Sequence, residues 1–421
     1  MARFASEHGH PTTDNATAVY FNPAALTLGD EPRLLVDLSL GLRRLSYTRR
    51  AQPSDAPPAA DATRANEGRA TLQNWLIGPA FAASFGLSEW QLGLGWFTPF
   101  GAPVSWDREG RDTSYPGIAD GVQRWHSIEG QIYTSVLAAA AARSFVAGRL
   151  RLGAALNLMG SLVEDVRARG DGTNDVAREG RALVRASGFA VGFGLGALVE
   201  VVDETLLVGV SYQSRPNVQG GMTLHGSTRV ALGGESRSDV DIHYDLPDTL
   251  RLGARYRASR SLELRLFGDL TRWSAFERQC IAIAGSPCEL RSDGSARPGS
   301  AIYQNLPRAF EDSVGLRAGA SVFTGPRWEV FSGLGFETRA VPDATLEPAL
   351  PDFHGASFAL GARLAVSRRV HVAASYTHFV FVPRHVRGRL ASYAPPSRQP
   401  DASGHYAQFV GVLNTNAELS F

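Results

Sequence analysis

From residue 34 to its end, this sequence repeats one pattern: apolar residues alternate with small or polar ones, and the connections alternate strictly between tight turns and long loops. Alternation with a period of two is typical of strands that bury one face, and helical periodicity is essentially absent. Short turns on one rim and long loops on the other indicate a transmembrane β-barrel. The pattern predicts fourteen strands, at residues 34–49, 72–87, 90–100, 123–143, 149–167, 181–201, 206–223, 239–257, 262–276, 310–324, 327–339, 353–367, 370–383 and 405–421.

The two faces of the predicted strands support the same architecture. Between residues 261 and 273, Leu262, Leu264 and Leu266 share one face, while Glu263 and Arg265 share the other. A soluble sandwich also alternates, but its apolar face would meet a second apolar face, and its loops would not sort by length. The predicted fold is therefore all-β, a fourteen-stranded antiparallel barrel. Six tryptophans near strand ends are expected to form an interfacial girdle: Trp75, Trp90, Trp106, Trp125, Trp273 and Trp328.

Composition excludes several other classes of protein. The sequence has no apolar run long enough for a transmembrane helix, and its net charge of +1 gives no indication of a nucleic-acid partner. No histidine, cysteine or carboxylate spacing supports a metal site, a cofactor or catalysis. Cys280 and Cys288 lie in a polar loop and fit either a disulfide formed in an oxidising compartment or two free thiols. The first residues lack the apolar core of a signal peptide, so we expect a trimmed or misannotated start.

The stretch DNATAVYFNPAAL, Asp14 to Leu26, precedes all the strands and is neither strand nor regular helix. Asn22-Pro23 is a turn signal, because proline fixes its own φ and disfavours the helical region for the residue before it. The apolar residues on both sides of this turn would pack against one another and make the segment compact. Taken alone, the stretch is an N-terminal arm docked on a domain.

Several segments together resemble the FadL/TodX family of outer-membrane transporters for long-chain fatty acids and other hydrophobic compounds. They are DNATAVYFNPAAL, WFTPFGAPVSW (residues 96–106), DLPDTLRLGARYRASRSLELRLFGDLTRWS (245–274), RWEVFSGLGFETRAVPD (327–343) and the last strand. The resemblance implies a hatch at residues 1–33 inside a barrel of residues 34–421, with Asn22, Pro23 and Ala24 at the family's NPA motif. It also implies that Phe421 is the signal for the barrel-assembly machinery.

Two prolines mark the wall between the predicted second and third strands. Pro99 stands just before Phe100-Gly101, and Pro79 would face it directly if the hairpin were centred on Glu89. Neither proline can donate a ladder hydrogen bond, so the wall would be weak at that level. We predict a lateral opening for hydrophobic ligands there, which agrees with the release route of the family. The alternative is a pair of tolerated prolines near a rim.

Alternation also places several arginines in the lumen. For these arginines two interpretations stay open: one or two hold a ligand carboxylate, or all belong to a lumenal salt-bridge network. As ligand-binding candidates we name Val19, Phe21, Arg251 and Arg255. The inward set comprises Arg151, Arg251, Arg255, Arg265, Arg317 and Arg363, with Glu263, Asp269, Glu329 and Glu418.

These observations predict a monomeric barrel of the Gram-negative outer membrane, not an enzyme, that takes up long-chain fatty acids or other hydrophobic compounds. Its expected partners are that ligand, outer-membrane lipid and lipopolysaccharide, and the barrel-assembly machinery. The alternative function is a structural or assembly barrel that anchors surface or secreted proteins. A general hydrophilic porin is disfavoured, because a hatch would block the channel.

Overall fold

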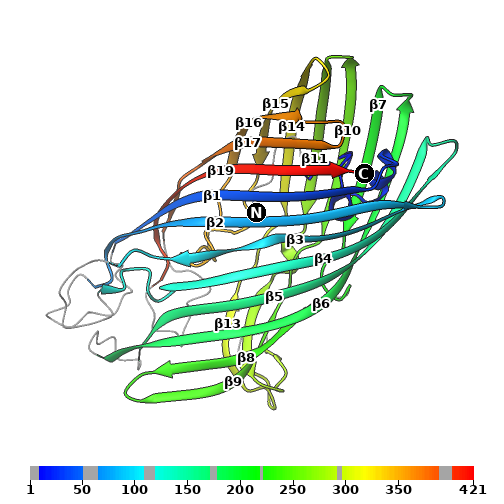
Figure 1. Ribbon diagram of the computed structural model, residues 1–421. Coiled ribbons are helices and arrows are strands. Elements are labelled where there is room, and N and C mark those ends of the chain that lie inside the picture. Colours follow the sequence, from blue (N-terminus) through cyan, green and yellow to red (C-terminus); the bar gives the residue numbers. More distant parts are fainter. Residues whose placement is uncertain are drawn as a thin grey trace.

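The computed structural model describes residues 9–50, 65–108, 119–170, 178–218, 221–291, 296–387 and 401–421, which form an antiparallel β-barrel (Figure 1). Neighbouring wall strands pair in chain order, and the last pairs with the first, which closes the sheet. The prediction of a fourteen-stranded barrel is confirmed. The wall strands are β1 (Arg33–Arg49), β2 (Gly68–Leu87), β3 (Trp90–Ser105), β4 (Glu129–Phe145), β5 (Leu150–Gly170), β6 (Glu179–Val202), β7 (Leu206–Gln213), β10 (Thr249–Ser259), β11 (Leu262–Thr271), β14 (Ser313–Thr324), β15 (Trp328–Glu337), β16 (Gly355–Ala365), β17 (Val370–Phe381) and β19 (Gly404–Ser420).

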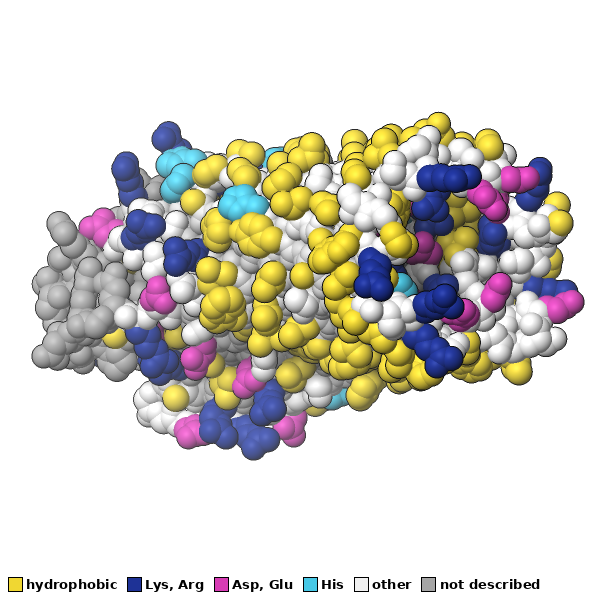
Figure 2. Space-filling view, turned by 45° about the horizontal axis from the view of Figure 1, so that its top comes forward, with side chains coloured by type: hydrophobic (Ala, Val, Ile, Leu, Met, Phe, Trp, Pro, Cys, Tyr) yellow, Lys and Arg dark blue, Asp and Glu magenta, His cyan; other side chains and the backbone are white. Residues whose placement is uncertain are grey.

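The alternating pattern separates a lipid-facing surface from a polar lumen. On β11, Leu264 and Leu266 are exposed on the outside, whereas Glu263 and Asp269 are buried inside. Figure 2 shows the outcome on one face of the barrel: a broad hydrophobic band, with charged side chains gathered towards both ends. Such a band is the surface that a bilayer covers. The predicted inward residues Arg251, Arg317, Glu263, Asp269, Glu329 and Glu418 are all buried.

The predicted tryptophan girdle is only partly right. Trp75, Trp90 and Trp328 are exposed on the outside of the barrel. Trp106 and Trp125 are buried in the loop that links β3 and β4, because the long loops pack on one another and need apolar cores of their own.

Two predicted wall strands run on into residues that belong to other strands. Residues 206–223 and 239–257 were each expected to form one strand, but the wall strands end at Gln213 and begin again at Thr249. Between them a hairpin leaves the barrel and pairs with the outer half of β6 and with a second hairpin. The period-two pattern continues through both places, so it does not reveal the change of pairing partner. The additional strands are β8 (Met222–Ala231), β9 (Glu235–Tyr244), β12 (Arg278–Ile283), β13 (Ile302–Pro307) and the short β18 (Arg384–Val386).

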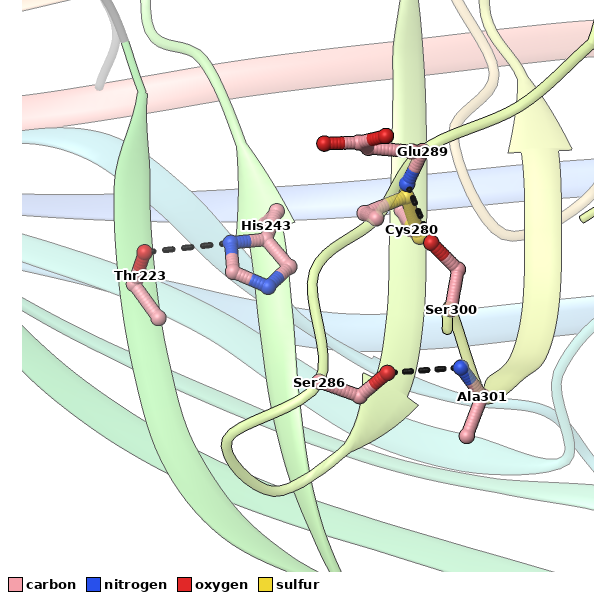
Figure 3. Close-up of a disulfide and its surroundings, with 8 residues drawn as sticks. Thr223, His243, Cys280, Ser286, Glu289, Ser300 and Ala301 are labelled. Carbon is pink, nitrogen blue, oxygen red and sulfur yellow. Dashed lines mark hydrogen bonds between the residues drawn. A yellow bond between two sulfur atoms is a disulfide. The ribbon is translucent and has the colours of Figure 1, made fainter. Parts of the chain in front are cut away.

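A disulfide links Cys280 on β12 to Cys288 in the following turn, with the two Cα atoms 6.4 Å apart (Figure 3). Cys280 faces His243 of β9 across the strand pair, and His243 Nδ1 lies 3.1 Å from Thr223 Oγ1 of β8. The disulfide therefore closes the turn that follows β12, next to the place where β8, β9 and β12 pair side by side.

The helices with described bounds lie in the N-terminal segment and in a short turn after β11. They are α1 (Ala18–Phe21), η1 (Pro23–Leu28) and η3 (Trp273–Ala275). None of the helices in the described ranges is long and apolar enough to cross a membrane.

Candidate functional site

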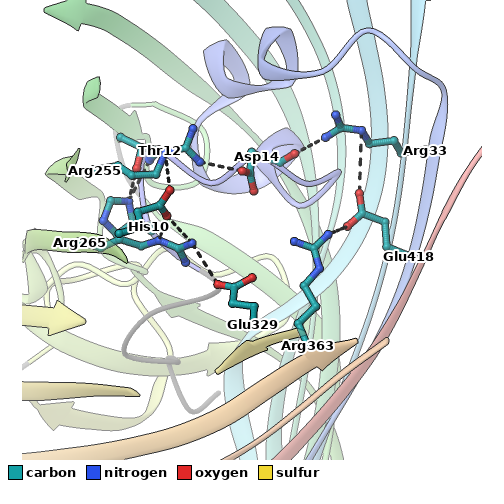
Figure 4. Close-up of polar contacts among 10 residues, drawn as sticks. His10, Thr12, Asp14, Arg33, Arg255, Arg265, Glu329, Arg363 and Glu418 are labelled. Atoms are coloured by element: carbon teal, nitrogen blue, oxygen red, sulfur yellow. Dashed lines mark hydrogen bonds and ion pairs between the residues drawn. The ribbon is translucent and has the colours of Figure 1, made fainter. Parts of the chain in front are cut away.

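The N-terminal segment, residues 9–29, lies inside the barrel near the end that holds the C-terminus (Figures 1 and 4). Asn22 joins its parts. The Asn22 side chain is fully buried, its Oδ1 accepts from the Ala24 amide at 3.2 Å, and its Nδ2 donates to Pro11 O at 2.6 Å. The same Nδ2 donates to Ala197 O of β6 at 3.3 Å. Pro23 then begins η1, where its missing N–H costs nothing.

Inward-facing glycines on five wall strands make room for this segment. They are Gly93, Gly153, Gly196, Gly209 and Gly253, from β3, β5, β6, β7 and β10; we call them the glycine seat. A Cβ at each of them would come within 3.0 Å of an atom of the segment, closer than real Cβ atoms approach their neighbours. At Gly153 the nearest atoms are backbone, with Ala24 N at 2.5 Å, and at Gly209 the Pro11 carbonyl oxygen would lie at 2.6 Å. Segment and wall are therefore in direct backbone contact.

Ion pairs hold the other side of the segment to the wall (Figure 4). Asp14 pairs with Arg255 of β10 at 2.7 Å, and Arg33 at the start of β1 donates to the Asp14 carbonyl oxygen. Burial raises the pKa of Asp14, but the positive charges of Arg255, Arg265 and Arg363 outweigh it and hold the pKa below its ordinary value. Asp14 therefore stays charged at neutral pH.

The same arginines belong to a wider lumenal network. Arg265 pairs with Glu263 at 2.7 Å and with Glu329 at 3.6 Å, and Arg363 pairs with Glu418 at 3.2 Å. On the neighbouring strands Arg317 pairs with Asp269. The salt-bridge interpretation of the inward arginines thus describes most of the set.

The aromatic residues of the segment pack against β3 and β10. The rings of Tyr20 and Phe97 stack with centroids 5.0 Å apart, and Phe21 contacts Phe97 edge-on. The Arg251 guanidinium lies 5.6 Å from the centre of the Phe21 ring, which is cation–π distance. Val19 is fully buried against Gly93.

The wall between β2 and β3 is incomplete. Their ladder runs from Leu87↔Trp90 only as far as Phe81↔Trp96, although both strands continue well beyond. Past that point a 3.4 Å hydrogen bond joins Thr98 Oγ1 to Pro79 O, and Asn74 donates to Pro103 O. Further out, Leu72 and Trp106 form a bridge and the Asp107 amide donates to Thr71 O at 2.8 Å.

The register corrects one detail of the prediction. The turn is the two-residue Ser88-Glu89, so its centre falls between those residues, and Pro79 would face Thr98 rather than Pro99. The opposite edge of β3 shows the irregularity as well, since its pairing with β4 shifts between Phe97 and Phe100. Gly101 has a φ of +119°, and a Cβ there would run into the carbonyl oxygen of Ile132. The local backbone therefore requires glycine at this position.

A lumenal cavity of about 270 Å³ adjoins the incomplete wall. Leu76 of β2 and Gly101 and Ala102 of β3 line its near side. Arg43 of β1 also lines it; this side chain is buried, its Nε donates to Gln408 Oε1 at 2.9 Å, and it pairs with no carboxylate among the described residues. The rings of Phe353, Phe379 and Phe381 also line it, as do the carboxyl groups of Asp352 and Glu337, the latter paired with Arg317 at 3.0 Å.

Interlocked loops cover the rim with the long connections. Arg308 pairs with the buried Glu347 and donates to Gln279 Oε1 at 2.7 Å. His126 Nδ1 lies 3.6 Å from the same Glu347 carboxylate. These groups come from three different loops or hairpins, so the cover is one connected structure.

The sequence matches a family described as outer membrane protein transport protein (OMPP1/FadL/TodX) over residues 8–389. This chain belongs to that family. It is accordingly a protein of the outer membrane, of a family that transports hydrophobic compounds and does not consist of enzymes. No curated protein matches the chain in sequence.

Solved structures of the FadL/TodX type share the fold. A Pseudomonas aeruginosa FadL homologue superposes with a TM-score of 0.80 at 15% identity, over 99% of this chain and 97% of that one. The Ralstonia pickettii toluene transporter TbuX gives 0.65 at 13%, over 99% of each chain. The Pseudomonas putida toluene transporter TodX gives 0.66 at 13%, over 97% of this chain and 94% of that one.

In this FadL/TodX barrel the predicted turn residues Asn22-Pro23 begin η1, and the lateral opening stays a prediction. Sequence reasoning missed two features. The glycine seat was missed because a glycine in a strand does not reveal what approaches it. Arg43 was missed, since the absence of a carboxylate partner appears only once the strands are assembled.

Proposed function

We propose that this protein takes up long-chain fatty acids or similar hydrophobic molecules with one acidic group. In this mechanism residues 1–33 act as a hatch, and the ligand leaves sideways between β2 and β3. The observation that carries the proposal is the incomplete β2–β3 ladder directly beside a lumenal cavity. An acyl chain gains about 0.8 kcal/mol for each CH₂ group removed from water, so a lateral route into lipid is much more favourable than release into an aqueous space.

Arg43 favours a carboxylate ligand over a plain hydrocarbon. A buried guanidinium without a carboxylate partner among the described residues is costly, and a ligand carboxylate would satisfy it with charge-assisted hydrogen bonds. The aromatic rings across the cavity would contact the start of the acyl chain. Toluene, for which TbuX and TodX are transporters, has no group that could bind Arg43.

Arg251 and Arg255 stay candidates for a second ligand site. In the structure they are engaged with the N-terminal segment, through the ring of Phe21 and the carboxylate of Asp14. A ligand would reach them, and Val19 beside Gly93, only after the segment moves. The predicted barrel-assembly signal at Phe421 also stays a proposal; this residue is exposed and its amide donates to Pro32 O at 3.1 Å.

A disulfide lock across the incomplete wall tests the lateral route. In the double variant Pro79→Cys/Thr98→Cys the new thiols face each other where the ladder has ended. Uptake of labelled oleate into reconstituted vesicles should fall at least about tenfold when the lock is oxidised and recover on reduction. The matched control, Ala83→Cys/Leu94→Cys, joins the same strands inside the intact ladder and should leave uptake unchanged. Undiminished uptake through the oxidised lock would refute lateral release.

A further inference from the structure

The outer wall carries a cationic surface that the proposed transport function does not use. It lies where β2, β1, β19 and β18 run side by side beyond the hydrophobic band. Pairing sets the outward face: Arg44 stands opposite Gln73, Thr48 opposite Arg69 and also opposite His405, and His405 opposite His385. The members of this surface, which we call the cationic patch, are Arg44, Arg69, His385, Arg387 and His405, and all five are exposed.

The patch begins directly above the hydrophobic band. Trp75 is 61% exposed and lies on the level of Leu42, two residues before Arg44 on the neighbouring strand. At about 3.4 Å per residue, Arg44 is about 7 Å along the strand from that level, and Thr48, the level of Arg69 and His405, about 14 Å further. Outward tryptophans mark the height of the lipid headgroups. The patch therefore occupies the headgroup layer on the side of the long loops, which is the outer leaflet.

The charges of this patch are unusually free of carboxylates. Among the described residues, Arg44 donates to the neutral Gln73 side chain at 2.7 Å, and neither Arg69 nor Arg387 has an ion pair. The carboxylates nearest in the strand pattern, Glu67 and Asp107, stand at the margin, where Asp107 accepts from Thr71 Oγ1.

Three other arginines on this rim pair with protein carboxylates. Arg181 pairs with Asp120 at 2.7 Å, Arg229 with Glu235 at 3.0 Å, and Arg272 with Asp248 at 2.8 Å. The arginines of the patch have no such partner among the described residues and are therefore available to an anion from outside the chain. Figure 2 shows arginines and histidines gathered beyond one end of the hydrophobic band.

We propose that the cationic patch binds the phosphate groups of the glycolipid that forms the outer leaflet. Strands 4.7–4.9 Å apart make the patch about 14 Å wide across four strands, and two levels of cations lie along them. Guanidinium groups bind phosphate oxygens through paired hydrogen bonds, and the imidazoles of His385 and His405, with ring centres 5.9 Å apart, add further donors. The acyl chains of the same lipid would cover the exposed apolar side chains below, which a free phosphate ion cannot do.

Binding to lipid A in detergent micelles tests this assignment. The wild-type protein should bind bisphosphorylated lipid A at least about tenfold more tightly than dephosphorylated lipid A, and the preference should weaken at high salt. The triple variant Arg44→Gln/Arg69→Gln/Arg387→Gln should bind the two lipids within about twofold of each other. The matched control, Arg149→Gln/Arg260→Gln/Arg327→Gln, removes the same charge from the turns at the opposite rim and should keep the preference.

Three results would overturn the proposal. Equal wild-type affinity for the two lipids would remove the role of phosphate, and an unchanged preference in the patch variant would remove the role of these arginines. Competition by millimolar inorganic phosphate as effective as that by lipid A would reduce the patch to a general anion site. Because the substituted arginines are exposed, folding is checked by the heat-dependent mobility of the barrel in electrophoresis, which should match the wild type.

Discussion

The glycine seat predicts that one methyl group will unseat the N-terminal segment. In Gly153→Ala the new Cβ would lie 2.5 Å from both Ala24 N and Pro23 C. Comfortable contact between such atoms needs about 3.5 Å, so the segment or the wall must move by roughly 1 Å. Both partners are backbone, so no side chain can rotate away. Overpacking of this kind costs about 1–3 kcal/mol.

That cost falls only on the seated state, because a displaced segment no longer meets the methyl group. The population of the displaced state should therefore rise roughly 5- to 150-fold. Purified protein in planar bilayers should show open-channel events at a correspondingly higher frequency, and the segment should be cut faster by added protease. Gly209→Ala, which meets the Pro11 carbonyl oxygen, should act in the same direction.

Gly194→Ala is the matched control. Gly194 lies on the same face of β6 as Gly196, but a Cβ there meets only Ala155 Cβ at 3.4 Å, Asn157 and Tyr212 O, and no atom of the segment. Its conductance should equal that of the wild type. If Gly153→Ala and Gly194→Ala behave alike while both barrels remain folded, the seat does not hold the segment and the reasoning is wrong.

Three further predictions concern the hatch, the loop cover and the disulfide. Asn22→Ala removes the bonds to Pro11, Ala24 and Ala197 and should raise open-channel frequency as Gly153→Ala does. Asn22→Asp keeps the acceptor for Ala24 but turns a second oxygen towards the carbonyls of Pro11 and Ala197, so it should raise the frequency as well; wild-type behaviour of both variants would contradict the role of Asn22. Burial raises the pKa of Glu347, but Arg308 and the His126 hydrogen bond hold it below the ordinary value, so its stabilisation is present above about pH 4.3 and lost as the pH falls further; the thermal stability of Glu347→Gln should be lower than wild type at pH 7, with a gap that closes in acid. Cys280→Ser removes the disulfide and should cost the β12–β13 hairpin about 2–3 kcal/mol of stability, so protease should cut residues 284–301 faster. The thermal unfolding temperature of the barrel should not change; a lower one would show that the hairpin supports the wall.

The barrel was predictable because the alternation of apolar and polar residues within each strand, and the turn between two strands, are local features that repeat along the chain. In β11 the polarity of each residue indicates whether it faces the lipid or the lumen. The register of the hairpin at Ser88-Glu89 can be predicted from the position of its turn to within one residue. The error of one residue still mattered, because it changed the residue that faces Pro79 from Pro99 to Thr98. The departure of the chain from the wall at Gln213 was not predictable, because β8 alternates just as a wall strand does and only its pairing with β6 differs.

The candidate site was predictable where a residue constrains its own backbone. Asn22-Pro23 and Gly101 are of this kind. Asp14 was not, because its importance comes from Arg255, which is 241 positions away in the sequence. Arg43 and the cationic patch depend on which charges have no partner, and that is a property of the assembled surface rather than of any segment.

The glycine seat also has a consequence for the order of assembly. The segment that it receives is synthesised first, yet the seat is built from strands that end with β10, more than two hundred residues later. Contacts of such long sequence separation form slowly. The first residues to emerge must therefore wait without a binding site until the wall strands from β3 to β10 have paired. The earliest part of the chain to be made would be among the later parts to reach its place.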